Sequence, residues 1–430
     1  MAEVEAEADR ISLLPLDIKI SILSRLSIKD AVRTSALARS WRHIWTHLPC
    51  LRLYSCQNPL DNPDIQTVHR LVSSLRGPLL DFQLFSSGPH DYQSVLQSLL
   101  DLLLQKGGVQ TLGLYINDDP KVILPSFHSL RELTLSGCSV VLPTGFRGFH
   151  LLKTLDMYEV EISNDDLNLL LRTSNNLTTL SILDSRDSGN PLSVNLNLPL
   201  LRHLLFEIND VVENVSVVSS PCLENALIKL GDVDISQNLA KMLLRLVTSV
   251  AMVSSLNLDF DVLNCFSLVP LPINFTIPRL KFLSFYLDVH TLDKRAYDAF
   301  FWLLRSMPFL EELEVELETV VAYDQADSVA ILMRQLLVKK HDGFVCLERT
   351  LTSVTIKMFT LDVIASVAWI QFFMLNAKGL KLLKIDFFGS DDLVPSFIEE
   401  LQKAQVTSSG AKLMIFNLYT RQTTTLCMNG

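Results

Sequence analysis

The chain has 430 residues, of which 48% are hydrophobic and 20% charged. This length exceeds one ordinary domain, and the hydrophobic fraction excludes a largely disordered chain. The formal net charge is −10 at pH 7, and an acidic bulk repels phosphates, so we expect no nucleic-acid partner. The N-terminal MAEVEAEAD lacks the regions of a secretory signal, and the densest apolar run, residues 363–375, is too short to span a membrane. We therefore expect an intracellular protein, cytoplasmic, nuclear or both, without a membrane contact.

The seven cysteines are scattered along the chain and form no C-x-x-C pair. This pattern favours reduced, mostly buried thiols and a reducing compartment. His47, Cys50 and Cys56 lie close together, but a single H-x-x-C lacks the second ligand pair of a zinc site, and packing at a helix end is the simpler interpretation. We expect neither a metal nor a cofactor.

The first predicted element is a helix that contains residues 18–26. Ile18, Ile22 and Leu26 recur at i, i+4 and i+8, and Ile20 and Leu23 widen the apolar arc beyond the roughly 100° that one buried face requires. A module of about forty residues cannot bury two apolar faces by itself. The pattern therefore predicts a docking module with a protein partner. The alternative is that these residues form only the core of a small helical domain.

Two further helices are predicted before residue 50. Ser27 and Asp30 form an S-x-x-D capping pattern that starts the second helix. The third carries one apolar face that ends at Pro49 and consists of Trp41, Ile44, Trp45 and Leu48. Residues 10–50 hold seven Lys or Arg against two Asp, a local charge of +5, which favours encounter with an acidic partner.

The segment from Asp9 to Trp45 resembles the plant form of the F-box, with DRISLLP, ILSRL and KDAVRTSALARSWRHIW at the motif positions. The family binds a Skp-type adaptor and, through it, the cullin of a ubiquitin ligase. The resemblance implies that the contact is formed by Leu14, Pro15, Ile18, Ile22, Leu23, Leu26, Leu37 and Trp41. Lys19, Ser27 and Ser40 depart from the usual family residues, and none of them removes an expected contact.

An L-x-x-L-x-L motif recurs along the rest of the chain. The four most regular copies are spaced by 22, 25 and 24 residues and begin at Leu130 (LRELTL), Leu152 (LKTLDM), Leu177 (LTTLSI) and Leu201 (LRHLLF). Six more copies follow between Leu223 and Leu380 at spacings of 22 to 41 residues, and degenerate copies begin at Leu79 and Val109. A period of about 20 to 29 residues resembles leucine-rich repeats. The alternative is an unrelated α/β fold with scattered leucine-rich strands.

The last repeats merge into a segment, CLERTLTSVTIKMF to WIQFFMLNAKGLKLLKI, that resembles the FBD region of plant F-box proteins. It reads as strand, helix, strand, helix and strand, an arrangement that would cap a repeat array. We therefore expect an α/β protein with a three-helix F-box module at 9–50, a curved, ribonuclease-inhibitor-like solenoid at 51–345 and an FBD-like cap at 346–420.

One strand carries an unusual row of carboxylates. In LEELEVELE, period-2 alternation places Glu312, Glu314, Glu316 and Glu318 on one face and the apolar residues on the other. In a leucine-rich repeat this face lies on the concave surface, where the row could bind a basic segment of a client protein. The alternative is a solvated strand face that resists aggregation.

No nucleotide-binding, metalloprotease or hydrolase motif is present, and no catalytic cysteine context is found, so we expect an adaptor and not an enzyme. The resemblance implies the substrate-recognition adaptor of a Skp-cullin-F-box (SCF) ligase, in which the solenoid binds an unknown client. A small-molecule receptor using the concave face is an alternative. A pocket for a carboxylate or phosphate ligand needs several basic groups that converge. The predicted concave positions offer basic residues only singly and among acidic ones, namely Arg131, Lys153, Arg202, Lys281 and Lys381. An interaction scaffold outside ubiquitin transfer is the third possibility.

Overall fold

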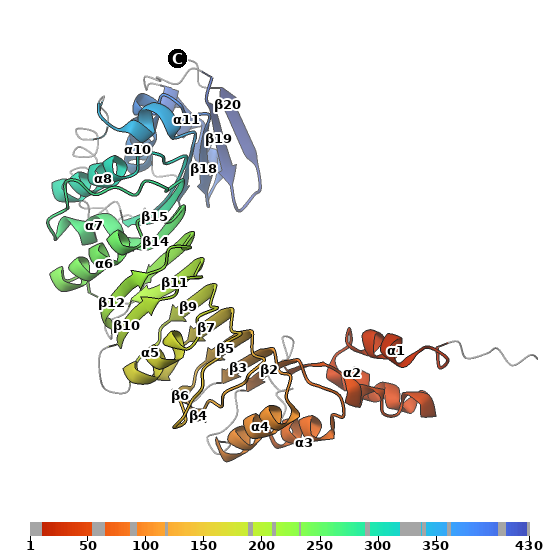
Figure 1. Ribbon diagram of the computed structural model, residues 1–430. Helices are drawn as coiled ribbons and strands as arrows, with labels where there is room; N and C mark the ends of the chain where they lie inside the picture. Colours follow the sequence, from red (N-terminus) through yellow and green to blue (C-terminus); the bar gives the residue numbers. More distant parts are fainter. Residues whose placement is uncertain are drawn as a thin grey trace, which may run out of the picture. The chain divides into compact units, whose positions relative to one another are not determined.

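The computed structural model describes residues 11–53, 65–86, 93–116, 119–187, 192–208, 212–231, 234–288, 293–318, 337, 341–358, 363–402 and 410–427 (Figure 1). The chain divides into two compact units. The first comprises residues 1–201 and 211–213, and the second comprises residues 202–210 and 214–430. Both are α/β, so the predicted class is confirmed at this level.

The first unit begins with the helical module. It contains α1 (Leu16–Leu23), α2 (Ile28–Arg33) and three short 3-10 turns, η1 (Thr34–Ala36), η2 (Arg39–Trp41) and η3 (Ile44–His47). The predicted cap of α2 is confirmed, since the Asp30 backbone N–H donates to Ser27 Oγ at 3.2 Å. The predicted third helix is wrong in detail, because Ala38 is extended and His43 leaves helical geometry (φ −123°, ψ 7°), which divides that segment into separate turns.

Parallel strands follow the module in the first unit. In spatial order they are β1 (Cys50–Leu53), β2 (Asp81–Ser86), β3 (Thr111–Ile116), β5 (Glu132–Ser136), β7 (Thr154–Tyr158) and β9 (Thr179–Leu183). The connections contain α3 (Ile65–Ser74), α4 (Gln93–Lys106), α5 (Asn164–Arg172) and β10 (Leu192–Asn197). A small second sheet joins β4 (Lys121–Ile123), β6 (Ser139–Val141) and β8 (Glu161–Ile162). The degenerate copies at Leu79 and Val109 therefore do form strands.

The leucine motif explains why these strands stack in register. In β5 the side chains of Leu133 and Leu135 are fully buried, whereas Glu132 is exposed and Thr134 is half-buried. Leu133 lies opposite Leu155 of β7, which in turn lies opposite Leu180 of β9. Each strand therefore buries its apolar face against the same face of its neighbours, as expected for repeats that cannot fold alone.

The second unit repeats this plan. Its strands are β11 (His203–Ile208), β13 (Asn225–Leu230), β14 (Ser255–Asp261), β15 (Phe282–Asp288), β16 (Glu312–Glu318), β17 (Ser353–Met358), β18 (Leu382–Phe387), β19 (Lys412–Asn417) and β20 (Thr423–Cys427). All neighbouring strands are parallel except β19 and β20, which are antiparallel. β12 (Val212–Ser219) follows β11 in the chain.

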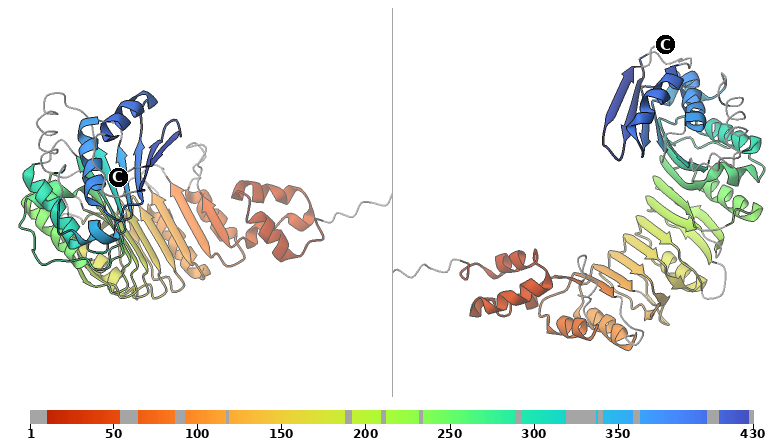
Figure 2. Two further views of the ribbon diagram at one scale, coloured as in Figure 1. Left: turned by 90° about the horizontal axis from the view of Figure 1, so that it is seen from above. Right: turned by 180° about the vertical axis from the view of Figure 1, so that it is seen from behind.

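Helices cover one face of this sheet (Figures 1 and 2). They are α6 (Gln237–Ser249), α7 (Val262–Ser267), α8 (Lys294–Ser306), α10 (Val363–Asn376) and α11 (Val394–Gln402), with shorter turns η5 (Cys346–Thr350) and η6 (Asp391–Leu393). The order β17, α10, β18, α11, β19 confirms the predicted alternation of the C-terminal region, whereas β20 is an additional strand that was not predicted. Among the described residues, no helix is long and apolar enough to cross a membrane.

An aromatic cluster fills the space between α8 and α10. Phe300 lies edge-on to Trp369, with ring centroids 4.7 Å apart, and to Phe372 at 5.4 Å. Edge-to-face pairs of this kind contribute beyond the area they bury. The cluster packs α10 against α8. In the chain, α10 connects β17 to β18.

The cysteines give the first testable prediction. Burial raises the pKa of Cys138 and of Cys265 to about 12 and that of Cys346 to about 11. At pH 8 roughly one in ten thousand of the first two is then thiolate, the reactive form. We expect iodoacetamide to label the exposed Cys222 and Cys427 in the native protein, and all seven cysteines after denaturation. Rapid native labelling of Cys138 or Cys265, measured by peptide mass spectrometry, would contradict this packing.

Candidate docking surface on the N-terminal module

The helical module has a small core of its own. Its fully enclosed members are Leu23, Ala31, Trp41, Ile44 and Leu48. Ile20, Ile28, Ala38 and Trp45 are partly buried against them. The core is formed by one face of α1, by Ala31 of α2 and by the segment from Trp41 to Leu48. The other face of α1 remains uncovered.

The uncovered face is strongly apolar. Ile18 is 44% exposed, Ile22 is 40% exposed and Leu26 is 44% exposed, and their spacing places Ile18 and Ile22 on one side of α1. Further exposed large apolar side chains of the module are Ile11, Leu13, Leu16 and Leu37, the last 75% exposed. Single exposed leucines are normal on a protein surface, but a concentration of seven within residues 11–37 indicates a binding surface.

The structure divides the eight residues predicted for the contact into two groups. Pro15, Ile18, Ile22, Leu26 and Leu37 are exposed, and Leu14 is half-buried. Leu23 is 0% exposed and Trp41 is 4% exposed, so the structure places these two in the core of the module, and their predicted part in the contact stays a prediction. Leu13 and Leu16 were missed, although their i, i+3 spacing around Pro15 is a signal that the sequence contains.

Lys19, one departure from the family pattern, has a structural role. Its side chain is buried, and its Nζ donates to the backbone carbonyl of Ser12 at 2.7 Å. The same ammonium lies over the Trp41 ring, 5.6 Å from the centroid. The hydrogen bond and the cation–π contact stabilise a cation that would otherwise be costly to bury. Lys19 therefore ties the segment before α1 to the core while Ile18 stays outside.

The module also carries exposed basic side chains. They are Arg25, Lys29, Arg33, Arg39 and Arg42. Arg33 pairs with Asp30 at 3.2 Å, and the pKa of Asp30 is lowered, chiefly by its hydrogen bond with Ser27 and further by Arg33. The exposed carboxylates of the described module are Asp17 and Asp30, so the surface remains net positive. This charge complements an acidic partner.

Comparison with known protein families identifies both parts of the chain. The family described as "F-box domain" matches residues 11–53. The family described as "FBD-associated F-box protein At5g56370, LRR repeats" matches residues 96–315, which is half of the chain. The chain therefore belongs to the plant F-box proteins with FBD-associated leucine-rich repeats, and the resemblance found in the sequence is confirmed.

Curated relatives agree with this assignment. The chain is 31% identical over 180 residues to "F-box/LRR-repeat protein At3g03360" of Arabidopsis thaliana, which covers 38% of this chain and 36% of that protein. It is 30% identical over 173 residues to "F-box/FBD/LRR-repeat protein At1g13570" of the same plant, covering 38% and 41%. A longer match, 27% identical over 341 residues, covers 71% of this chain and 74% of "F-box/FBD/LRR-repeat protein At3g26920" of Arabidopsis thaliana. The first two matches thus span less than half of those relatives.

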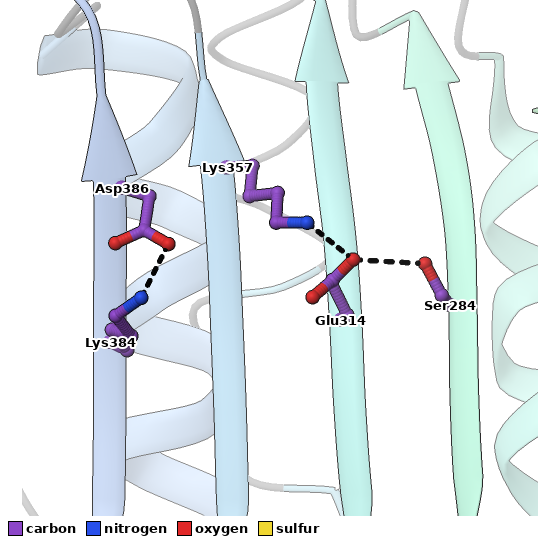
Figure 3. Close-up of polar contacts among 5 residues, drawn as sticks. All are labelled: Ser284, Glu314, Lys357, Lys384 and Asp386. Carbon is purple, nitrogen blue, oxygen red and sulfur yellow. Dashed lines mark hydrogen bonds and ion pairs between the residues drawn. The ribbon is translucent and has the colours of Figure 1, made fainter. Parts of the chain in front are cut away.

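The predicted carboxylate row lies on β16, and Glu314 is on the strand face away from the helices (Figure 3). Glu314 Oε1 accepts from Lys357 Nζ of β17 at 2.7 Å and from Ser284 Oγ of β15 at 3.3 Å. The charge of Glu314 is therefore compensated by Lys357. Glu312 is exposed and Glu316 half-buried, and neither has an ion pair among the described residues, whereas the side chain of Glu318 lies outside them.

The neighbouring strands of this face carry their own compensated charges. Lys384 Nζ donates to Asp386 Oδ2 at 2.7 Å on β18 (Figure 3), and Lys229 pairs with Asp259 at 3.2 Å. At the ends of the strands, Arg202 pairs with Glu224 and Lys281 pairs with Glu311, at 2.8 and 2.9 Å. Among the described residues of β16, Glu312 and Glu316 have no ion pair.

The division between core and surface gives a second prediction. Trp41→Ala removes a buried aromatic ring and should destabilise the module by about 3–5 kcal/mol, whereas Ile22→Ala removes exposed surface and should stay within about 0.5 kcal/mol. Hydrogen–deuterium exchange of peptides from residues 16–33 in the full chain measures both effects. Equal loss of amide protection in the two variants would contradict the assignment.

Proposed function

We propose that this chain is the substrate-recognition adaptor of an SCF ubiquitin ligase and has no enzymatic activity of its own. The observation that carries the proposal is the surplus apolar face on a segment that matches the F-box domain. The F-box would bind a Skp-type adaptor and through it a cullin, and the repeat strands would bind the client.

The contact surface that we propose consists of the exposed and half-buried side chains only. Its members are Leu13, Leu14, Pro15, Leu16, Ile18, Ile22, Leu26 and Leu37. Burial of one such side chain contributes roughly 1.5–3 kcal/mol before the cost of association. Leu23 and Trp41 act indirectly, by keeping α1 in place. The basic side chains of the module would speed encounter with an acidic partner more than they would tighten the complex.

For the client, the favoured surface is the open strand face of the second unit. Glu312 and Glu316 are four residues apart on one strand face, a spacing that an extended segment with Lys or Arg at every fourth residue would match. The small-molecule alternative has no comparable support, because two of its five candidate cations, Arg202 and Lys281, are held in ion pairs.

The third prediction tests the adaptor contact. The double variant Ile18→Ser, Ile22→Ser should lose at least tenfold in affinity for a Skp-type adaptor, because two desolvated apolar contacts are removed. A matched control is Leu200→Ser, which changes a leucine of similar exposure outside the module. Pull-down and titration calorimetry with the full chain measure the difference. Equal binding by the double variant and the control would refute the proposed surface, and absence of adaptor binding by the unaltered chain would favour the scaffold alternative.

The fourth prediction tests the client face. Clients would first be identified by affinity purification with and without proteasome inhibition. Glu312→Lys with Glu316→Lys should weaken client binding, since like-charge contacts at an interface cost several kcal/mol. Binding by the unaltered chain should also weaken as salt rises, because exposed charges are screened over about 8 Å at physiological ionic strength.

The control for this experiment is Asp298→Lys with Glu399→Lys, which makes the same charge change at exposed positions of the covering helices α8 and α11. We expect the control to bind clients normally. Full client binding by the strand variant, or client binding by the unaltered chain that does not change with salt, would contradict the proposal. Glu312 and Glu316 would then belong to a solvated strand face without a client contact.

A further inference from the structure

The unpredicted strand β20 forms the end of the sheet in the described part of the second unit. One of its edges pairs with β19, and no described strand pairs with the other. Natural proteins usually protect such edges with charged residues, proline or a bulge. β20 has the sequence TTTLC, without charge or proline, and its residues are exposed except for the half-buried Leu426. The strand therefore offers an open edge that can accept another strand.

The hydrogen bonds of the hairpin show which backbone groups face this edge. The Asn417 N–H donates to the carbonyl of Gln422 at 3.0 Å. Because pairs alternate along an antiparallel ladder, Thr424 and Leu426 direct their backbone groups at β19. Thr423, Thr425 and Cys427 consequently direct their N–H and C=O groups at the open edge.

A cleft of about 480 Å³ lies beside β20 on the helix side of the sheet. Thr424 of β20 and the preceding Gln422 line it, together with Pro395 and Ile398 of α11. Ile415 of β19 also lines it. The lining is mainly apolar, so the cleft would receive an apolar side chain from a strand that is added to the edge.

We propose that β20 pairs with β20 of a second copy of this chain, antiparallel and with Thr425 on the twofold axis. In this register all five residues of each strand are paired, and Thr423 lies opposite the partner's Cys427. The two copies of Thr425 face each other, a Thr–Thr pair that is favourable across antiparallel strands. Leu426 of each copy then lies opposite Thr424 of the other, at the mouth of the apolar cleft.

The properties of the strand favour a second copy as its occupant. β20 has no charge, so two identical strands meet without repulsion. The pairing is self-complementary, as a twofold contact requires. It goes beyond the proposed ligase function, because it would bring two F-box modules into one assembly. A contact made mainly by one pair of five-residue strands is small compared with the roughly 1,000 Å² of a stable interface, so we expect a weak, reversible dimer.

Sedimentation of the full-length chain over a range of concentrations tests the proposal. Thr425→Pro removes an N–H that points at the open edge and leaves the pairing with β19 intact, whereas Thr425→Val keeps the N–H and the branched shape. We expect a reversible dimer for the unaltered chain and for Thr425→Val, and a monomer for Thr425→Pro. A monomer for the unaltered chain at every attainable concentration would overturn the proposal. The β20 edge would then favour a strand of a different protein as its partner. A Thr425→Pro variant that still dimerises, and whose melting temperature equals that of the unaltered chain, would also overturn it.

Cross-linking tests the register. In a hydrogen-bonded antiparallel pair the two Cα atoms are about 5.5 Å apart, which a disulfide can bridge. In a Cys427→Ser background, Thr425→Cys should give a covalent dimer under mild oxidation, and Thr424→Cys, which faces the partner's Leu426, should not. Efficient cross-linking by Thr424→Cys in place of Thr425→Cys would overturn the proposed register.

Discussion

The stacking of inward leucines from one parallel strand to the next is the constraint on which the rest of the structure depends. Leu133, Leu155 and Leu180 occupy equivalent positions in adjacent strands, and all three are fully buried. Because side chains alternate along a strand, fixing the leucines inside also fixes which residues face outward. The outward positions of β16 are for this reason available for ion pairs with its neighbours, as between Glu314 and Lys357.

The N-terminal module follows the opposite principle. Its core closes with five residues and a buried lysine, and the rest of its apolar side chains stay in contact with solvent. An exposed apolar surface of this kind is typical of a protein-binding site. At β20, likewise, no described strand pairs with the second edge of an uncharged strand, and both features are consistent with the contacts proposed above.

The sequence predicted the repeat strands, the cap at Ser27 and the alternation of the C-terminal region, because each depends on neighbouring residues. It could not separate Leu23 from Ile22, since both faces of α1 are apolar and helical period alone does not say which face is inward. The pairing of Glu314 with Lys357, 43 residues away, depends on the register of two strands and not on a local motif. β20 was missed because TTTLC has no apolar alternation to distinguish it from a loop.

The most direct test of the account is hydrogen–deuterium exchange of the full chain with and without a Skp-type adaptor. We expect the adaptor to protect peptides that contain residues 11–26 and to leave the strands of the second unit unchanged, because the proposed contact lies on α1 and the segment before it. Unchanged exchange across residues 11–26 in a saturated complex would contradict the central claim that the exposed apolar face of the F-box is the adaptor contact.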